Sequence, residues 1–117
     1  MKVLIVDDDS DIREALTDAL TDHGFDVAAA SDGRDALDWL RQNPAPCLIL
    51  LDWMMPRCDG LTFRTEQKQD PSLAEIPVVL LTADFQLDQK RKALDAMAHL
   101  SKPVSLDNLL NVVRRCC

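Results

Sequence analysis

The sequence predicts an α/β fold in which a parallel β-sheet is covered by helices on both faces. Short apolar segments alternate along the chain with segments whose apolar residues recur at helical spacing. Alternating strands and crossover helices are typical of parallel sheets, because each helix packs back onto the sheet between two strands. In addition, residues 47–51 are apolar at every position, as expected for a central strand that is buried on both faces.

Five segments are predicted to be strands because they are apolar and end at polar or turn-forming residues. They cover residues 2–6, 26–30, 47–51, 76–81 and 99–101. The segment 26–30 has a weaker apolar pattern than the others, and 99–101 is short. All five are expected to lie in one sheet.

The first two helices are indicated by regular apolar faces. In the first, the inward face is expected to consist of Ile12, Ala15, Leu16, Ala19 and Leu20. Asp9, Ser10 and Asp11 are candidates for its N-cap, and Gly24 is a candidate for its C-cap. The second helix is expected at 32–42. Its inward residues are expected to be Ala36, Leu37 and Leu40.

The remaining helices have less regular apolar faces. A helix capped by Asp59 offers only Leu61 and Phe63 as clear inward residues. A short, highly charged helix is expected near 86–95. Ser105 is expected to cap the last helix. Its inward residues are expected to be Leu106, Leu109, Leu110 and Val113.

The composition favours one folded domain spanning residues 1–117. Hydrophobic residues make up 47% of the chain, which is enough for a buried core. The net charge of −7 argues against a nucleic-acid-binding surface and suits metal cations or basic partner surfaces. No apolar run approaches membrane-spanning length, and the residues before the first acidic group are too few for a signal peptide.

The cysteine pattern favours free thiols. None of the four cysteines forms a CxxC pair, and no histidine lies at metal-ligand spacing from them, so a zinc site is not expected. The adjacent Cys116 and Cys117 are interpreted as free thiols rather than as part of a structural disulfide. This interpretation predicts a reducing, cytoplasmic location.

Polar residues lie at the carboxyl ends of four predicted strands, where ligands bind in open parallel sheets. They are Asp7, Asp8, Asp52, Thr82 and Lys102. Three carboxylates at one edge are stabilised by a cation, and Mg²⁺ prefers carboxylate oxygens and commonly works with phosphate. Asp52 suits a carboxylate nucleophile, while Lys102 and Thr82 offer a charge and a hydroxyl group to phosphoryl oxygens.

Each of these residues also has a simpler interpretation. Aspartates at strand ends often form turns or cap helices, and a local cap is the favoured interpretation of Asp9. The pair Asp7 and Asp8, taken alone, fits a turn equally well. Thr82 alone is typical of a strand, and Lys102 alone is typical of a charged surface. Their expected convergence at one edge is what favours a phosphate site.

Four segments resemble the receiver domain of response regulators in two-component signalling. They are LIVDDDS (4–10), LILLDWMMPRCDG (48–60), VVLLTA (78–83) and SKP (101–103). The four segments span nearly the whole chain in the family's order and with roughly its spacing, so the set is highly specific. The resemblance implies a flavodoxin-like (βα)5 fold with strand order 2-1-3-4-5.

The resemblance also implies a chemistry. By position, Asp52 matches the phospho-acceptor, which takes a phosphoryl group from a sensor histidine kinase or a phosphotransfer protein. Asp8 and Asp52 match direct Mg²⁺ ligands, and Asp7 matches a ligand that acts through water. The backbone carbonyl of Met54 completes the implied metal site.

Further positions imply phosphoryl binding and a conformational switch. Thr82 and Lys102 match the phosphoryl-binding pair, and Lys102-Pro103 matches the family's cis peptide. His99 occupies the position of the aromatic switch residue, and a histidine titrates near neutral pH. A part-exposed strand residue without a special role is the simpler interpretation of His99.

The family's output face implies a downstream protein or output domain as a second partner. That face comprises the fourth helix, fifth strand and fifth helix, and the thin apolar stripe at 86–95 predicts a mobile helix there. Asp95 stands where the family usually has glycine. Arg64 and Gln67 stand where an apolar residue is common. These departures bear on signalling output more than on the chemistry.

Three other functions compete with this interpretation. A degenerate receiver would bind a protein without being phosphorylated, but all five chemical positions are present. A metal-dependent phosphatase with an aspartate nucleophile usually has a second acid two residues later, where this chain has Met54. A dinucleotide-binding domain is excluded because the sequence contains no GxGxxG motif.

Overall fold

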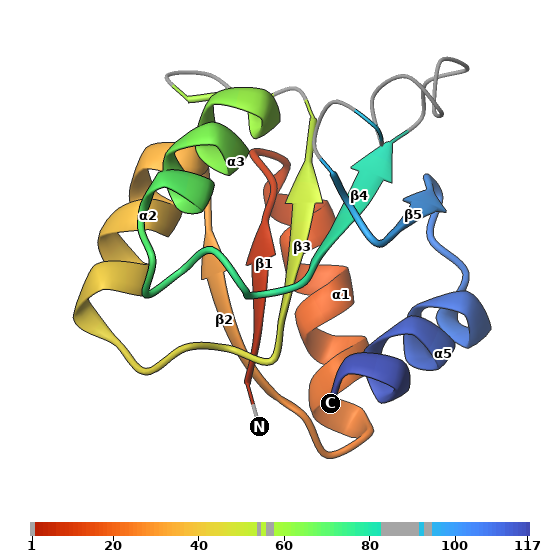
Figure 1. The fold of residues 1–117 in the computed structure, drawn as a ribbon. Coiled ribbons are helices and arrows are strands. Elements are labelled where there is room, and N and C mark those ends of the chain that lie inside the picture. Colours follow the sequence, from red (N-terminus) through yellow and green to blue (C-terminus); the bar gives the residue numbers. More distant parts are fainter. Residues whose placement is uncertain (1, 54, 56–57, 83–91, 93–94) are drawn as a thin grey trace.

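The computed structural model describes residues 2–53, 55, 58–82, 92 and 95–117. These residues form five strands and four helices (Figure 1). In chain order they are β1 Lys2–Val6, α1 Ser10–Asp22, β2 Asp26–Ala30, α2 Gly33–Gln42, β3 Leu48–Asp52, α3 Gly60–Gln69, β4 Val78–Thr82, β5 Ala98–Ser101 and α5 Leu106–Cys116. The helix expected near 86–95 lies almost entirely outside the described residues.

The strands form one parallel sheet in the order β2-β1-β3-β4-β5, which confirms the predicted fold. All residues of β3 and β4 are buried, as expected for strands covered on both faces. Because the strands are parallel, their carboxyl ends meet at one edge of the sheet, which lies at the arrowheads in Figure 1.

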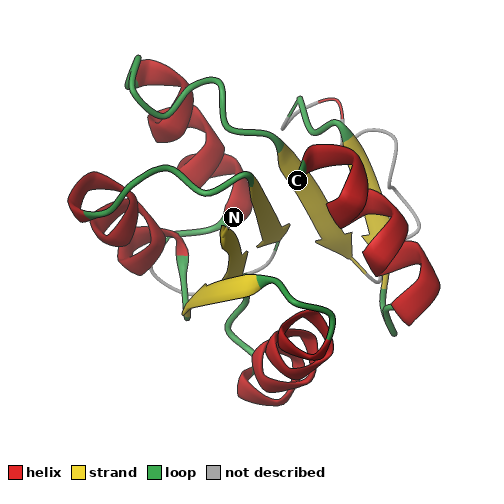
Figure 2. Ribbon diagram, turned by 90° about the horizontal axis from the view of Figure 1, so that it is seen from below, coloured by secondary structure: helices red, strands yellow, loops and turns green. Residues whose placement is uncertain are grey.

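Helices cover both faces of the sheet, as Figure 2 shows in a view from below. Alternate residues of β1 supply the two cores, because successive side chains of a strand point to opposite faces. Val3 and Ile5 pack with α1 and α5, whereas Leu4 and Val6 pack with α2 and α3. Among the described helices, none is long and apolar enough to cross a membrane.

Polar side chains fix the start of each described helix. Asp9, Asp32, Asp59 and Ser105 are the N-caps of the four helices, and each accepts a hydrogen bond from a backbone N–H of the first turn. The interpretation of Asp9 as a cap is therefore confirmed. Gly24 follows α1 with φ of +87°, a left-handed conformation that favours glycine at a helix end.

Three expected inward residues are in fact exposed. Ala15 on α1 is exposed, and Leu61 on α3 and Leu106 on α5 are 40% and 45% exposed. Leu61 and Leu106 each lie in the first turn of their helix. The other expected inward residues of α2 and α5 are buried, so most of their predicted faces are confirmed.

The inward face of α3 is instead completed by two polar residues. Arg64 and Gln67 are buried, and Arg64 Nη1 donates to Gln67 Oε1 at 2.8 Å. Arg64 also donates to the carbonyl oxygens of Ile76 and Asp95, and Gln67 Nε2 donates to those of Leu73 and Ile76. These contacts attach α3 to the segments that lead into β4 and β5. Asp95, at the expected glycine position, has φ of 53°.

The expectation that Cys117 carries a free thiol is wrong. Cys117 forms a disulfide with Cys47, and their Cα atoms are 5.6 Å apart. Cys58 and Cys116 are free cysteines. The adjacent cysteines at the end of the chain gave no indication of this pairing, which forms because the fold brings the end of α5 to the start of β3 (Figure 1). The predicted reducing compartment therefore loses the support that it took from free thiols.

Candidate functional site

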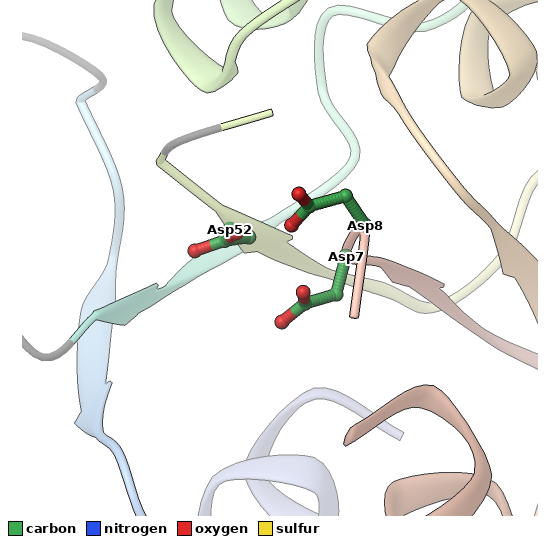
Figure 3. Close-up of side chains that lie close together, drawn as sticks. All are labelled: Asp7, Asp8 and Asp52. Carbon is green, nitrogen blue, oxygen red and sulfur yellow. The ribbon is translucent and has the colours of Figure 1, made fainter. Parts of the chain in front are cut away.

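The carboxyl edge of the sheet brings together the acidic residues that the sequence singles out. Asp7 directly follows β1, and Asp52 is the last residue of β3. One carboxylate oxygen each from Asp7, Asp8 and Asp52 lies within 4.8 Å of the others. In Figure 3, the three side chains extend from two neighbouring strand ends into the same space. The predicted convergence of these acids is therefore present in the structure.

The Asp7 side chain is held in one orientation. Asp7 is fully buried, its backbone N–H donates to the Ala30 carbonyl, and its Oδ1 accepts a hydrogen bond from the Asp9 N–H at 2.9 Å. Its Oδ2 is buried without a well-directed hydrogen bond from any described residue, although the Lys102 ammonium lies 2.9 Å away as an ion pair. The neighbouring Asp8 is exposed.

Lys102 bridges the two buried carboxylates. Its Nζ lies 2.9 Å from Asp7 Oδ2 and donates to Asp52 Oδ1 at 3.2 Å. Burial alone would lower the pKa of Lys102, but its contacts with Asp7 and Asp52 raise that pKa above its ordinary value. Lys102 is therefore a fixed positive charge inside the acid cluster. The peptide bond between Lys102 and Pro103 is cis, as the resemblance implies.

Asp52 has a perturbed acidity. Burial, followed by the charge of Asp7, raises the pKa of Asp52 from 3.8 to about 6, and Lys102 opposes this rise. Only 7% of Asp52 is exposed, so its charged form loses most of its solvation. A residue with such a pKa at a ligand-binding edge is a candidate for chemistry.

The acid cluster fits a hard cation. The fit rests on three converging carboxylates, on the buried Asp7 Oδ2, and on the burial and repulsion that together raise the pKa of Asp52. Hard divalent cations such as Mg²⁺ prefer oxygen ligands of this kind. Met54, whose carbonyl is an expected ligand, lies outside the described residues.

Thr82 and Lys102 are joined across neighbouring strands at the same edge. Thr82 ends β4, is buried, and its carbonyl oxygen accepts a hydrogen bond from the Lys102 N–H at 2.9 Å. His99 lies further back on β5, paired with Leu80, and is partly buried. It lines a groove between β5 and α5 together with Asn108 and Asn111.

Sequence reasoning missed two residues beside the site. Arg13, on the first turn of α1, donates from Nη1 to the Asp7 carbonyl at 2.6 Å. Gly60 lies so close to the backbone that follows β3 that an added Cβ would be 2.8 Å from the Asp52 carbonyl oxygen. The DG pair at 59–60 was a visible signal for Gly60. No comparable sequence pattern marks Arg13, because its side chain contacts a backbone carbonyl in the preceding turn.

Comparison with known proteins identifies the family. The model of the response regulator receiver domain matches residues 3–114. The chain belongs to this family. It is the receiver domain of a two-component response regulator, as the sequence resemblance indicated. Receiver domains are signalling phospho-acceptors rather than classical enzymes.

Individual relatives agree with this assignment. The response regulator MprA of Mycolicibacterium vanbaalenii is 37% identical over 116 residues, which cover 97% of this chain and 49% of the relative. MprA of Mycobacterium leprae is 36% identical over 116 residues, covering 97% of this chain and 50% of the relative. The chain thus spans about half the length of these curated relatives.

Solved structures show the same fold at full coverage. A response regulator from Chloroflexus aurantiacus superposes with a TM-score of 0.89 at 30% identity, covering 98% of this chain and 95% of that one. The chemotaxis response regulator CheY4 of Vibrio cholerae superposes with a TM-score of 0.88 at 32% identity, covering 99% and 98%.

Proposed function

We propose that this receiver accepts a phosphoryl group on Asp52 from a sensor histidine kinase or a phosphotransfer protein, in a Mg²⁺-dependent reaction. The observation that carries the proposal is the position of Asp52 at the carboxyl edge. There, a buried carboxylate lies beside Asp7 and Asp8 and contacts the Lys102 ammonium. Membership of the family supports the same chemistry.

Asp52 acts as the nucleophile. One of its carboxylate oxygens attacks the phosphorus atom of the phosphohistidine, the P–N bond breaks, and the electron pair leaves with the imidazole. Because the pKa of Asp52 is about 6, its carboxyl group is mostly ionised at neutral pH and able to attack. Phosphoryl transfer needs chiefly positioning and charge neutralisation, which the neighbouring residues supply.

Lys102 and Thr82 receive the phosphoryl group. The Lys102 ammonium, which bridges Asp52 and Asp7 before the reaction, turns one contact toward a phosphoryl oxygen. The Thr82 hydroxyl donates to a second oxygen. Asp8, Asp52 and the Met54 carbonyl would hold Mg²⁺ directly, and Asp7 would hold it through a water molecule. When bound, Mg²⁺ supplies a doubly positive centre that offsets the carboxylates and the phosphoryl oxygens.

Phosphorylation then biases a two-state equilibrium that signals to a downstream protein or an output domain. In this proposal, Thr82 moves toward the phosphoryl group and His99 acts as the switch residue on β5. The output face includes β5 and α5. Residues 1–117 form one receiver domain, and its −7 net charge suits protein partners better than nucleic acid.

Intact-protein mass spectrometry after incubation with acetyl phosphate tests the proposal. The wild-type chain is expected to gain one phosphoryl group with MgCl2 and none with EDTA. Asp52→Asn is expected to gain none, whereas Asp107→Asn, an exposed control on α5, is expected to behave as wild type. If the wild type gains nothing with MgCl2, the chain acts instead as a phosphorylation-independent binding module.

A further inference from the structure

We propose that Arg13 is a positioning residue for the Mg²⁺ site and that it acts by holding the backbone of the acidic turn between β1 and α1. The inference rests on the proposed function, because it takes Mg²⁺ as the ion that the acids bind. Arg13 touches neither the ion nor the phosphoryl group in this account. It sets the direction in which Asp7 and Asp8 present their carboxylates.

The contact that carries this inference is short and links a helix to the turn before it. Arg13 Nη1 donates to the Asp7 carbonyl at 2.6 Å, in a partly buried position. A hydrogen bond from a charged donor is stronger than one between neutral groups. The Arg13 backbone N–H donates to the Asp9 carbonyl in the same turn. Arg13 therefore holds two carbonyl groups of the acidic segment, one on each side of Asp8.

The Asp7 carbonyl belongs to the peptide that joins the two proposed ligands. The rest of Asp7 is held by other groups: its N–H donates to Ala30, its Oδ1 accepts from Asp9, and its Oδ2 faces Lys102. A rotation of the peptide between Asp7 and Asp8 would turn the exposed Asp8 carboxylate away from Asp52. The Arg13 guanidinium opposes that rotation, because it binds the oxygen of this peptide.

Arg13 and Lys102 are expected to affect the binding of a cation in different ways. Lys102 lies between the carboxylates of Asp7 and Asp52, so its charge competes with a cation for the same oxygens. Arg13 contacts the backbone oxygen of Asp7 rather than a carboxylate oxygen. If Arg13 acted only as a positive charge, its removal would strengthen Mg²⁺ binding. If it acts as a positioning residue, its removal weakens Mg²⁺ binding. The sign of the change therefore separates the two roles.

The test is thermal unfolding of the purified chain over a series of MgCl2 concentrations, with EDTA as the reference. The rise of Tm with concentration gives an apparent dissociation constant for Mg²⁺. Arg13→Met keeps the aliphatic part of the side chain and removes its donors. Arg13→Lys restores a charged donor that can reach toward the turn. Arg41→Met removes an exposed arginine from α2 and controls for net charge.

Arg13→Met is expected to weaken Mg²⁺ binding about tenfold, as is usual when a partner that orients a metal ligand is lost. Arg13→Lys is expected to recover most of that loss, and Arg41→Met to bind as wild type. Unchanged or tighter binding by Arg13→Met overturns the proposal. If Arg13→Met does not fold, Arg13→Ala, which also removes the donors and favours the helix, takes its place. Tenfold weaker binding by Arg13→Ala supports the proposal, and unchanged or tighter binding overturns it. If the Tm of the wild-type chain does not change with MgCl2, the Mg²⁺ site of the proposed function is itself contradicted.

Discussion

Both burial and neighbouring charges determine the pKa of Asp52 in this receiver. Its pKa is raised to about 6 by burial and by Asp7, so the folded state binds a proton at Asp52 more tightly than the unfolded state does. Ionised Asp52 therefore opposes folding. The stability of the fold, as far as Asp52 contributes to it, falls as the pH rises from about 4 to about 6. A bound cation favours the ionised form and reverses this effect.

The pKa of Asp52 can be measured by NMR of its side-chain carboxyl carbon. Without divalent cations, the resonance is expected to titrate near pH 6, and saturating MgCl2 is expected to move the titration to lower pH. The titrating resonance is expected to be absent from Asp52→Asn, which assigns it to Asp52. A midpoint for Asp52 that MgCl2 leaves in place would mean that the ion does not bind at this carboxylate.

Most site residues were predictable because each occupies the end of a strand. Once the alternation of strands and helices is recognised, parallel topology alone places Asp7, Asp52, Thr82 and Lys102 at one edge. Arg13 was not predictable in this way. Its contact depends on the path of the turn between β1 and α1, which local sequence patterns do not specify.

The third helix shows how a helix with few apolar inward residues can still pack against the sheet. Arg64 and Gln67 of α3 are buried because their side chains donate to backbone oxygens at the approaches to β4 and β5. Burial lowers the pKa of Arg64, and Asp95 opposes this effect. A periodicity analysis that scores only apolar residues finds a poor inward face here, although polar residues fill it.

The polar contacts of α3 predict that two neighbouring basic residues, Arg64 and Lys68, contribute unequally to the free energy of unfolding. Arg64→Met leaves the buried side-chain oxygen of Gln67 and the carbonyl oxygen of Asp95 without this donor, and it is expected to lower the free energy of unfolding by about 2–4 kcal/mol. Lys68→Met breaks an exposed ion pair with Asp95 and is expected to lower the free energy of unfolding much less than Arg64→Met does. Urea unfolding measures both, and equal losses would refute a structural role for the buried guanidinium.

The disulfide acts on the whole molecule because it joins residues 70 positions apart. It attaches the end of α5 to the start of β3, at the edge of the sheet opposite the acid cluster (Figure 1). A cross-link of this span restricts the unfolded chain, which stabilises the fold by about 4 kcal/mol in the chain-entropy description. Local sequence patterns miss such a pairing because it exists only once the sheet has brought both ends together.

The effect of the disulfide is testable by comparing two adjacent cysteines. Without reductant, the free energy of unfolding of Cys117→Ser is expected to be about 4 kcal/mol lower than that of the wild type. Cys116→Ser, which leaves the disulfide intact, is expected to differ little. In excess dithiothreitol, most of the difference in the free energy of unfolding between the wild type and Cys117→Ser is expected to disappear. An advantage that survives full reduction would assign the stabilisation to packing of the Cys117 side chain.

Asp52 is the residue proposed to carry the phosphoryl group, and peptide mapping tests this assignment directly. After reaction with acetyl phosphate and MgCl2, borohydride reduction converts an acyl phosphate of aspartate to homoserine, which tandem mass spectrometry locates. Trypsin releases residues 42–57, in which Asp52 is the only aspartate, separately from residues 3–13, which carry Asp7 and Asp8. Homoserine confined to position 52 is the predicted result. Homoserine at position 7 or 8, with position 52 unmodified, would contradict the account.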